Sequence, residues 1–306
     1  MSKEPTRPRV YPSARDTVAE AQCQSDSPQT CSPSFRLAFA DQDFLTSDDT
    51  RAVRLQLEWQ KFDLLLSRAG IDHTIVMFGS ARIRPADIAA KHTETVQKLL
   101  AADPNNPQRE RELRYQQSLQ QKSEYYEYTR HLAARIAAES EQTFGFPATV
   151  ITGGGPGIME AANRGASDAG KPSIGLNIVL PKEQQPNPYI TPEFCFHFHY
   201  FAIRKMHFLM RARSIITFPG GFGTLDEVIE TLTLLQTGRI RPLPIVLFGR
   251  RYWQRVINFE AMVEEGTIEE KDLQLFRYAD SVDEAFEHIA AFYRAHPLTN
   301  GEALVE

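Results

Sequence analysis

Two glycine-rich segments carry the residues best suited to chemistry. The first reads Thr149-Val-Ile-Thr-Gly-Gly-Gly-Pro-Gly-Ile-Met159, and the second reads Ser214-Ile-Ile-Thr-Phe-Pro-Gly-Gly-Phe-Gly-Thr-Leu-Asp-Glu227. Each is typical of a buried strand, then a turn for which glycine is suited, then the start of a helix. Backbone N–H groups at such a helix start bind anions, phosphate above all. The sequence therefore predicts two phosphate-binding loops, with the carboxylate of Glu227 beside the second.

Two familiar phosphate motifs fit these residues less well. A dinucleotide fingerprint needs glycine at the sixth position from Gly153, where Ile158 stands, and the next strand ends in Leu180 instead of an acidic residue. A Walker-like string at Gly165–Lys171 is followed by Pro172, which cannot supply the magnesium-binding hydroxyl, and it follows a helix instead of opening one. Dinucleotide and P-loop binding are both disfavoured.

The elements that must position the two loops are short apolar strands alternating with helices. Continuous apolar runs of this kind indicate a parallel sheet covered on both faces. The runs lie at Thr74–Phe78, Thr149–Thr152, Ser173–Val179, Ser214–Phe218 and Leu243–Phe248. We therefore predict an α/β fold, a Rossmann-like doubly wound parallel sheet. In such a sheet, loops at the carboxyl ends of the strands can face one crevice.

The predicted organisation is a single domain with an N-terminal helix and tails. Residues 1–46 are rich in Ser, Pro, Gln and Asp without a sustained period, which is typical of a disordered tail. A helix is expected to begin after Ser47 and to end at Gly70. The predicted divisions are a tail at 1–46, the helix at 47–73, the nucleotide-binding domain at 74–295, a helical insertion in it at about 85–122, and a tail at 296–306.

Composition excludes several classes of partner. The chain of 306 residues has 34 Lys and Arg against 39 Asp and Glu, so its net charge of −5 does not attract nucleic acid or an anionic membrane. No apolar run approaches the roughly 20 residues that a membrane-spanning helix needs, and the N-terminus lacks the apolar core of a signal peptide. We expect a cytoplasmic protein that binds neither nucleic acid nor membranes.

The second loop and a nearby basic pair resemble a known family. Pro219-Gly-Gly-Phe-Gly-Thr-Leu-Asp-Glu227 matches the signature P-G-G-x-G-T-x-x-E of the LOG family, the cytokinin riboside 5′-monophosphate phosphoribohydrolases, without a departure. Arg204-Lys205 resembles the Arg-Lys pair that the family carries before the same strand, and the first glycine loop is similar too. The likeness runs from about Thr74 to Tyr293 and is interrupted by the insertion at 85–122.

This resemblance implies an activity and a set of site residues. The activity is hydrolysis of the N-glycosidic bond of a nucleoside 5′-monophosphate, either AMP or an N6-modified AMP such as a cytokinin ribotide, to free base and ribose 5-phosphate. No cofactor is implied, and the family is homodimeric. Glu227 would stabilise the oxocarbenium ion and activate water, while Arg204 would grip the nucleotide. The other implied substrate-binding residues are Gly154, Gly155, Gly157, Met159, Lys205, Gly220, Gly221, Gly223, Thr224, Thr233 and, more weakly, Ser80.

Two other functions remain open on the same fold. A non-catalytic carrier of a nucleotide-like or molybdopterin-type ligand would use the same loops, but it would not need both Arg204 and Glu227. Some relatives of the family have been labelled lysine decarboxylases, whose pyridoxal phosphate requires a Schiff-base lysine. No lysine of this sequence stands in an evident cofactor motif.

A metal site is the least supported alternative. Cys195, His197 and His199 alternate along one predicted strand, so they would point to the same side of a sheet. At the rise of a strand, three such ligands span about 13 Å, which is too far for one ion. We therefore expect no metal and interpret the segment as a packed strand.

Overall fold

The computed structural model describes residues 11–21, 26–181 and 185–298. The chain forms two compact units, Met1–Gln60 and Lys61–Glu306. Helix α3, Arg51–Arg68, contains the boundary. A short 3-10 turn at Asp48–Thr50 precedes α3, so the helix expected after Ser47 begins as a 3-10 turn and continues as an α-helix.

The first unit contains helical segments where a tail without regular structure is expected. They are α1 at Ala14–Ala21, 3-10 turns at Pro33–Phe35 and Ala38–Ala40, and α2 at Gln42–Thr46. No residue of these four segments is buried. Local hydrogen bonds define them instead: the Asp41 carboxylate accepts from the backbone N–H groups of Asp43 and Phe44 at the start of α2. Residues 1–10 and 22–25 of the predicted tail lie outside the described residues.

The second unit is built on a parallel sheet. Among the described residues the sheet has seven strands, in the order β4-β3-β2-β1-β5-β6-β7, and every neighbouring pair is parallel. The strands are β1 Thr74–Phe78, β2 Thr149–Thr152, β3 Ser173–Ile178, β4 Cys195–Phe198, β5 Ala212–Thr217, β6 Ile245–Phe248 and β7 Arg277–Ala279. The predicted Rossmann-like, doubly wound α/β fold is confirmed.

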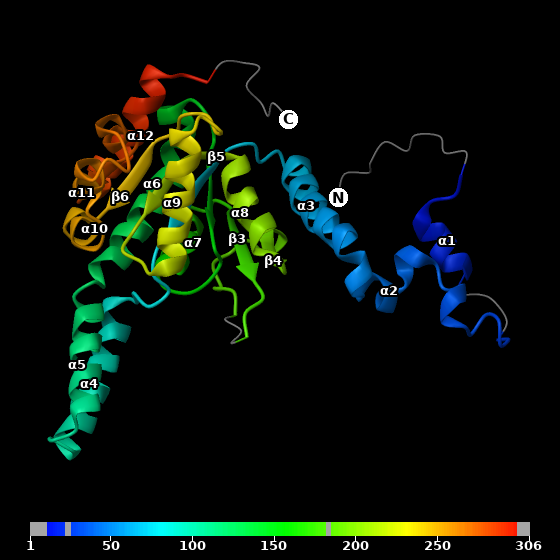
Figure 1. Ribbon diagram of the computed structural model, residues 1–306, viewed down its shortest axis with the longest axis horizontal. Coiled ribbons are helices and arrows are strands. Elements are labelled where there is room, and N and C mark those ends of the chain that lie inside the picture. Colours follow the sequence, from blue (N-terminus) through cyan, green and yellow to red (C-terminus); the bar gives the residue numbers. More distant parts are fainter. Residues whose placement is uncertain (1–10, 22–25, 182–184, 299–306) are drawn as a thin grey trace. The chain divides into compact units, whose positions relative to one another are not determined.

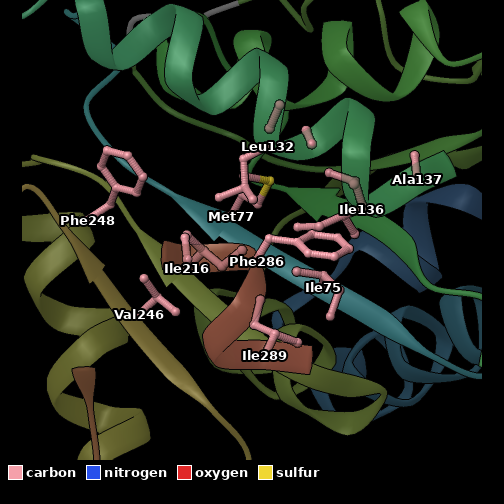
Figure 2. Packing of buried hydrophobic residues seen from close by; sticks show 14 of the residues in the cluster. Ile75, Met77, Leu132, Ile136, Ala137, Ile216, Val246, Phe248, Phe286 and Ile289 are labelled. Carbon is pink, nitrogen blue, oxygen red and sulfur yellow. The ribbon is translucent and has the colours of Figure 1, made fainter. Parts of the chain in front are cut away.

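Helices cover both faces of the sheet, because successive side chains of a strand point to opposite faces. Ile75 and Met77 of β1 pack on one face with α6, α7 and α12, and Figure 2 shows Met77 near Leu132 of α6 and Ile75 near Phe286 of α12. Val76 of β1 packs on the other face against α3 and α8, including Phe62. The remaining helices, labelled in part in Figure 1, are α4 Ala86–Ala102, α5 Pro107–Gln120, α6 Glu124–Phe144, α7 Ile158–Asp168, α8 Phe201–Met210, α9 Phe222–Gln236, α10 Arg250–Val256, α11 Phe259–Glu264 and α12 Val282–Ala295.

The segment expected as a helical insertion, about 85–122, forms α4 and α5, which follow β1 and precede α6 along the chain. The two helices pack against each other and project from the sheet (Figure 1). Asn106 caps α5 by accepting from the backbone N–H groups of Gln108 and Arg109, and Pro107 occupies the first helical position. Among the described helices, none is long and apolar enough to cross a membrane.

The order of the strands reverses direction at β1. The chain runs outward from β1 through β2 and β3 to β4, then returns to place β5 on the other side of β1. Two hydrogen bonds join the segments at the carboxyl ends of β1 and β5. The Phe218 N–H donates to the Phe78 carbonyl at 2.9 Å, and the Ser80 N–H donates to the Pro219 carbonyl at 3.0 Å. Open α/β sheets bind ligands at such a reversal, outside the carboxyl ends of the strands.

Candidate active site

A cavity of about 790 Å³ lies at the carboxyl ends of β1 and β5. Its wall combines the second glycine loop, the turn after β1 and side chains of α5, α8, α9 and α10. This volume is within the range of small-molecule sites, roughly 300–1,000 Å³. The predicted site residues that line it are Ser80, Met159, Arg204, Gly220, Gly221, Gly223, Thr224 and Glu227.

The second glycine loop leads directly into α9. A Cβ on Gly220 would lie 2.1 Å from Thr224 Oγ1, so no larger residue fits there, whereas Gly221 and Gly223 have open space around them. The Thr224 and Leu225 N–H groups both donate to the Gly221 carbonyl at 3.0 Å. The N–H groups of Phe222 and Gly223, which open the helix, have no intrahelical acceptor and are available to an anion in the cavity. The Tyr252 hydroxyl donates to the Gly220 carbonyl and fixes the loop against α10.

Glu227 lies in the second turn of α9 and is only 8% exposed. Burial raises the pKa of its carboxyl to about 7, because the ionised form loses its hydration, although the positive charges of Lys205 and Arg204 oppose the shift. A carboxyl that titrates near neutral pH in a cavity is suited to proton transfer and to stabilising a cation.

Arg204 is held in place by the elements around it. Its Nε donates to the Leu176 carbonyl at 2.7 Å, its Nη2 donates to the Gly153 carbonyl at 3.5 Å, and its guanidinium lies 5.2 Å from the centre of the Phe208 ring. Burial lowers its pKa, and the charge of Glu227 opposes that effect. Among the described residues no ion pair joins Arg204 to a carboxylate, so its remaining donors can serve a ligand.

The first glycine loop contributes to the cavity through Gly153 and Met159, not through the three glycines implied by the family resemblance. Gly154 and Gly155 are buried, and the Asn187 side-chain amide donates to both of their carbonyl oxygens at 3.1 Å. Gly157 has a φ of +73°, a conformation that other residues rarely adopt. These three glycines therefore determine the shape of the loop but do not line the cavity.

Two further implied residues, Lys205 and Thr233, do not line the cavity. Lys205 Nζ lies 2.9 Å from Asp226 Oδ2 and 2.8 Å from Glu230 Oε2. Its positive charge lowers the pKa of Glu227, although Lys205 itself does not line the cavity. Thr233 is six residues after Glu227, which at 3.6 residues per turn places it on another side of α9. Its hydroxyl donates to a backbone carbonyl of the same helix.

Several cavity residues have no signal in the sequence. The insertion contributes Tyr115, Ser118, Leu119 and Lys122, although its surrounding sequence is polar and lacks any motif. Arg82, in the turn after β1, lines the cavity as well. Their contribution depends on how α5 packs on the domain, which local patterns do not encode.

Strand β4 has the alternation expected of a packed strand. Phe196 and Phe198 are buried, while Cys195 and His197 are exposed. Among the described residues no group of three or more His, Cys, Asp or Glu is arranged to hold a metal ion.

Comparisons with known proteins agree with the motif. Residues 159–289 match a family model described as "Possible lysine decarboxylase". The chain is 29% identical over 152 residues to "Cytokinin riboside 5′-monophosphate phosphoribohydrolase LOG4" of Arabidopsis thaliana, covering 48% of this chain and 68% of that protein. It is 28% identical over 139 residues to a probable enzyme of the same name from Oryza sativa subsp. japonica, covering 44% of this chain and 59% of the rice protein.

Solved structures are similar at a greater distance. The X-ray structure of TM1055 is 18% identical with a TM-score of 0.42, covering 72% of this chain and 99% of its own. The molybdenum cofactor carrier protein from Chlamydomonas reinhardtii is 17% identical with a TM-score of 0.42, covering 74% of this chain and 99% of its own. The sequence matches, together with the complete signature Pro219–Glu227, show that the chain is related to the LOG family.

Proposed function

We propose that the chain hydrolyses the N-glycosidic bond of a nucleoside 5′-monophosphate, AMP or an N6-modified AMP such as a cytokinin ribotide, to free base and ribose 5-phosphate. The observation that carries the proposal is that a buried carboxylate, Glu227, shares one cavity with a helix-start glycine loop and with Arg204. The names of the curated relatives support the same reaction.

Each group has a defined task in this reaction. The loop at Gly220–Thr224 binds the 5′-phosphate through backbone N–H groups. As the bond from C1′ to the base breaks, positive charge develops on the ribose, and the ionised carboxylate of Glu227 stabilises it. The same carboxylate accepts a proton from the water that adds to C1′, while the departing base takes up a proton from solvent. Arg204 holds the nucleotide through its planar guanidinium.

Lysine decarboxylation, the activity in the family model's description, fits these residues poorly. Pyridoxal phosphate needs a lysine at its carbonyl carbon. Of the lysines in the matched region 159–289, Lys171, Lys205 and Lys271 do not line the cavity, and Lys182 lies outside the described residues. Lys122 does line the cavity, but it lies outside the matched region and its Nζ donates to the Ser118 carbonyl and hydroxyl. Lys205 is instead held by two carboxylates. We therefore derive no step through that cofactor.

The test is to incubate the purified chain with a panel of nucleosides and nucleoside 5′-monophosphates and to detect free base by chromatography. We expect base release from at least one monophosphate, and far less from its nucleoside, because a prepared anion site left empty has unpaired donors. Tight nucleotide binding without any base release would refute hydrolysis and favour the carrier. The predicted homodimer is tested separately by sedimentation of the same preparation.

A further inference from the structure

Two cationic side chains on the cavity wall have no carboxylate partner within the part of the chain that the structure describes. Lys122, at the end of the insertion, donates from Nζ to the Ser118 carbonyl at 3.0 Å and to Ser118 Oγ at 2.8 Å. Arg82 donates from Nη1 to the Tyr115 hydroxyl at 3.2 Å. Among the described residues neither side chain forms an ion pair, whereas Lys205, outside the cavity, forms two. These two cations are therefore available to an anionic ligand.

Both cations line the same cavity as the loop that begins α9. The Ser80 N–H donates to the Pro219 carbonyl, which places the turn containing Arg82 next to that loop. On the insertion side, Lys122 lines the cavity together with Tyr252, whose hydroxyl donates to the Gly220 carbonyl. The two positive charges thus lie on the wall of the cavity into which the start of α9 opens, where the helix dipole already favours an anion.

Lys122 is also in an environment that disfavours an isolated cation. Burial lowers the pKa of its ammonium, and the nearby positive charge of Arg255 lowers it further. A phosphate beside Lys122 would supply the missing negative charge. A phosphate monoester has more acceptor positions than the N–H groups of one helix turn can fill, and an ammonium with three rotatable donors suits the rest.

We propose that Lys122 and Arg82 form a cationic clamp that binds the substrate's phosphate together with the loop at Gly220–Thr224. The insertion at 85–122 is then a phosphate-recognition element of the site and not only a surface addition. The identity of the substrate rests on the function proposed above. The clamp itself rests on two cations that line the cavity with this loop and form no ion pair with another described residue, and inorganic phosphate is enough to probe it.

The test compares Lys122→Gln and Arg82→Gln with two control variants on the insertion at 85–122. The controls are Lys98→Gln and Arg111→Gln, which remove exposed charges that do not line the cavity. Loss of one charge-assisted hydrogen bond should raise KM for AMP, and the inhibition constant of inorganic phosphate, by about tenfold. We expect kcat to change by less than about twofold, since the contact is present before and during the reaction. Both controls should keep wild-type values.

Values within about twofold of wild type for both cavity variants would overturn the clamp, since a contact to phosphate is worth more than that. If the wild type releases no base from any nucleotide, the proposed function fails while the clamp stays testable. Calorimetric titration of inorganic phosphate into the wild type and the four variants then decides it. Weaker binding in the two cavity variants alone supports the clamp, and equal binding in all five proteins refutes it.

Discussion

Replacing Glu227 by Gln should stabilise the protein at alkaline pH. Burial raises the pKa of this carboxyl from its ordinary 4.5 to about 7. Between these two values the folded protein keeps a proton that the unfolded chain has released, so the stability of the fold falls as the pH rises through this window. Glutamine has nearly the same shape but does not ionise, so the variant should lack this loss.

The size of the effect follows from the same shift. One pKa unit is about 1.4 kcal/mol, so a rise from 4.5 to about 7 corresponds to about 3 kcal/mol of destabilisation, complete above pH 7. Little of this should be lost to solvent screening, because the side chain is only 8% exposed. At pH 4.5 and below, the carboxyl is protonated in the folded protein, and the two proteins should have similar stability.

The assay is urea unfolding of both proteins at pH 5 and at pH 8, with the exposed Glu264→Gln as a control. The free energy of unfolding of Glu227→Gln should exceed that of the wild type by about 2–3 kcal/mol at pH 8 and by much less at pH 5. The control should follow the wild type at both pH values. A Gln variant that gains no stability relative to the wild type between pH 5 and pH 8 would refute the argument that Glu227 is ionised at a cost in its buried position.

Three further predictions concern activity. Since the reaction uses ionised Glu227, kcat/KM for AMP should rise with pH and level off above about 7. If kcat/KM has already reached its plateau below pH 5, Glu227 is not the group whose ionisation controls the rate. Gly220→Ala should weaken AMP binding by forcing Thr224 to move, as measured by calorimetric titration, and wild-type affinity would contradict the role of this loop. Arg204→Lys should raise KM and lower kcat in steady-state assays, because an ammonium cannot donate to the Leu176 and Gly153 carbonyls and to a ligand at the same time as a planar guanidinium can. Wild-type kinetics would mean that Arg204 does not bind the nucleotide.

The sequence is sufficient to predict the features that depend on local patterns. The bounds of β1 and β2 agree with the apolar runs at 74–78 and 149–152, because strands buried on both faces are uninterrupted by polar residues. The three-residue β7, Arg277–Ala279, is missed because only Ala279 is buried and the segment is too short to have a pattern. Glu227 and the second glycine loop are found because a single short motif contains both.

The rest of the site depends on packing between distant segments. Arg204 and Lys205 are adjacent in sequence, but only Arg204 lines the cavity, because neighbouring residues of a helix point in different directions. Lys122 reaches the cavity because α5 packs beside the turn after β1, which no pattern within 85–122 predicts. At Gly154 of the first loop a Cβ would lie 2.4 Å from Asn177 Oδ1, so this glycine makes room for a side chain of β3 that the local sequence does not reveal.

The most direct test measures single-turnover hydrolysis of AMP by the wild type and by Glu227→Gln. Enzyme is in excess and concentrated enough to bind all of the nucleotide, and free adenine is measured by chromatography. If the carboxylate stabilises the ribosyl cation and activates water, the rate constant for adenine release should fall by about 10²–10⁴ in the variant, the usual contribution of a positioned general base. Nucleotide binding should be retained, since the phosphate loop and Arg204 are unchanged. A rate within about threefold of the wild type would contradict the assignment, because it would mean that Glu227 does not take part in the chemical step.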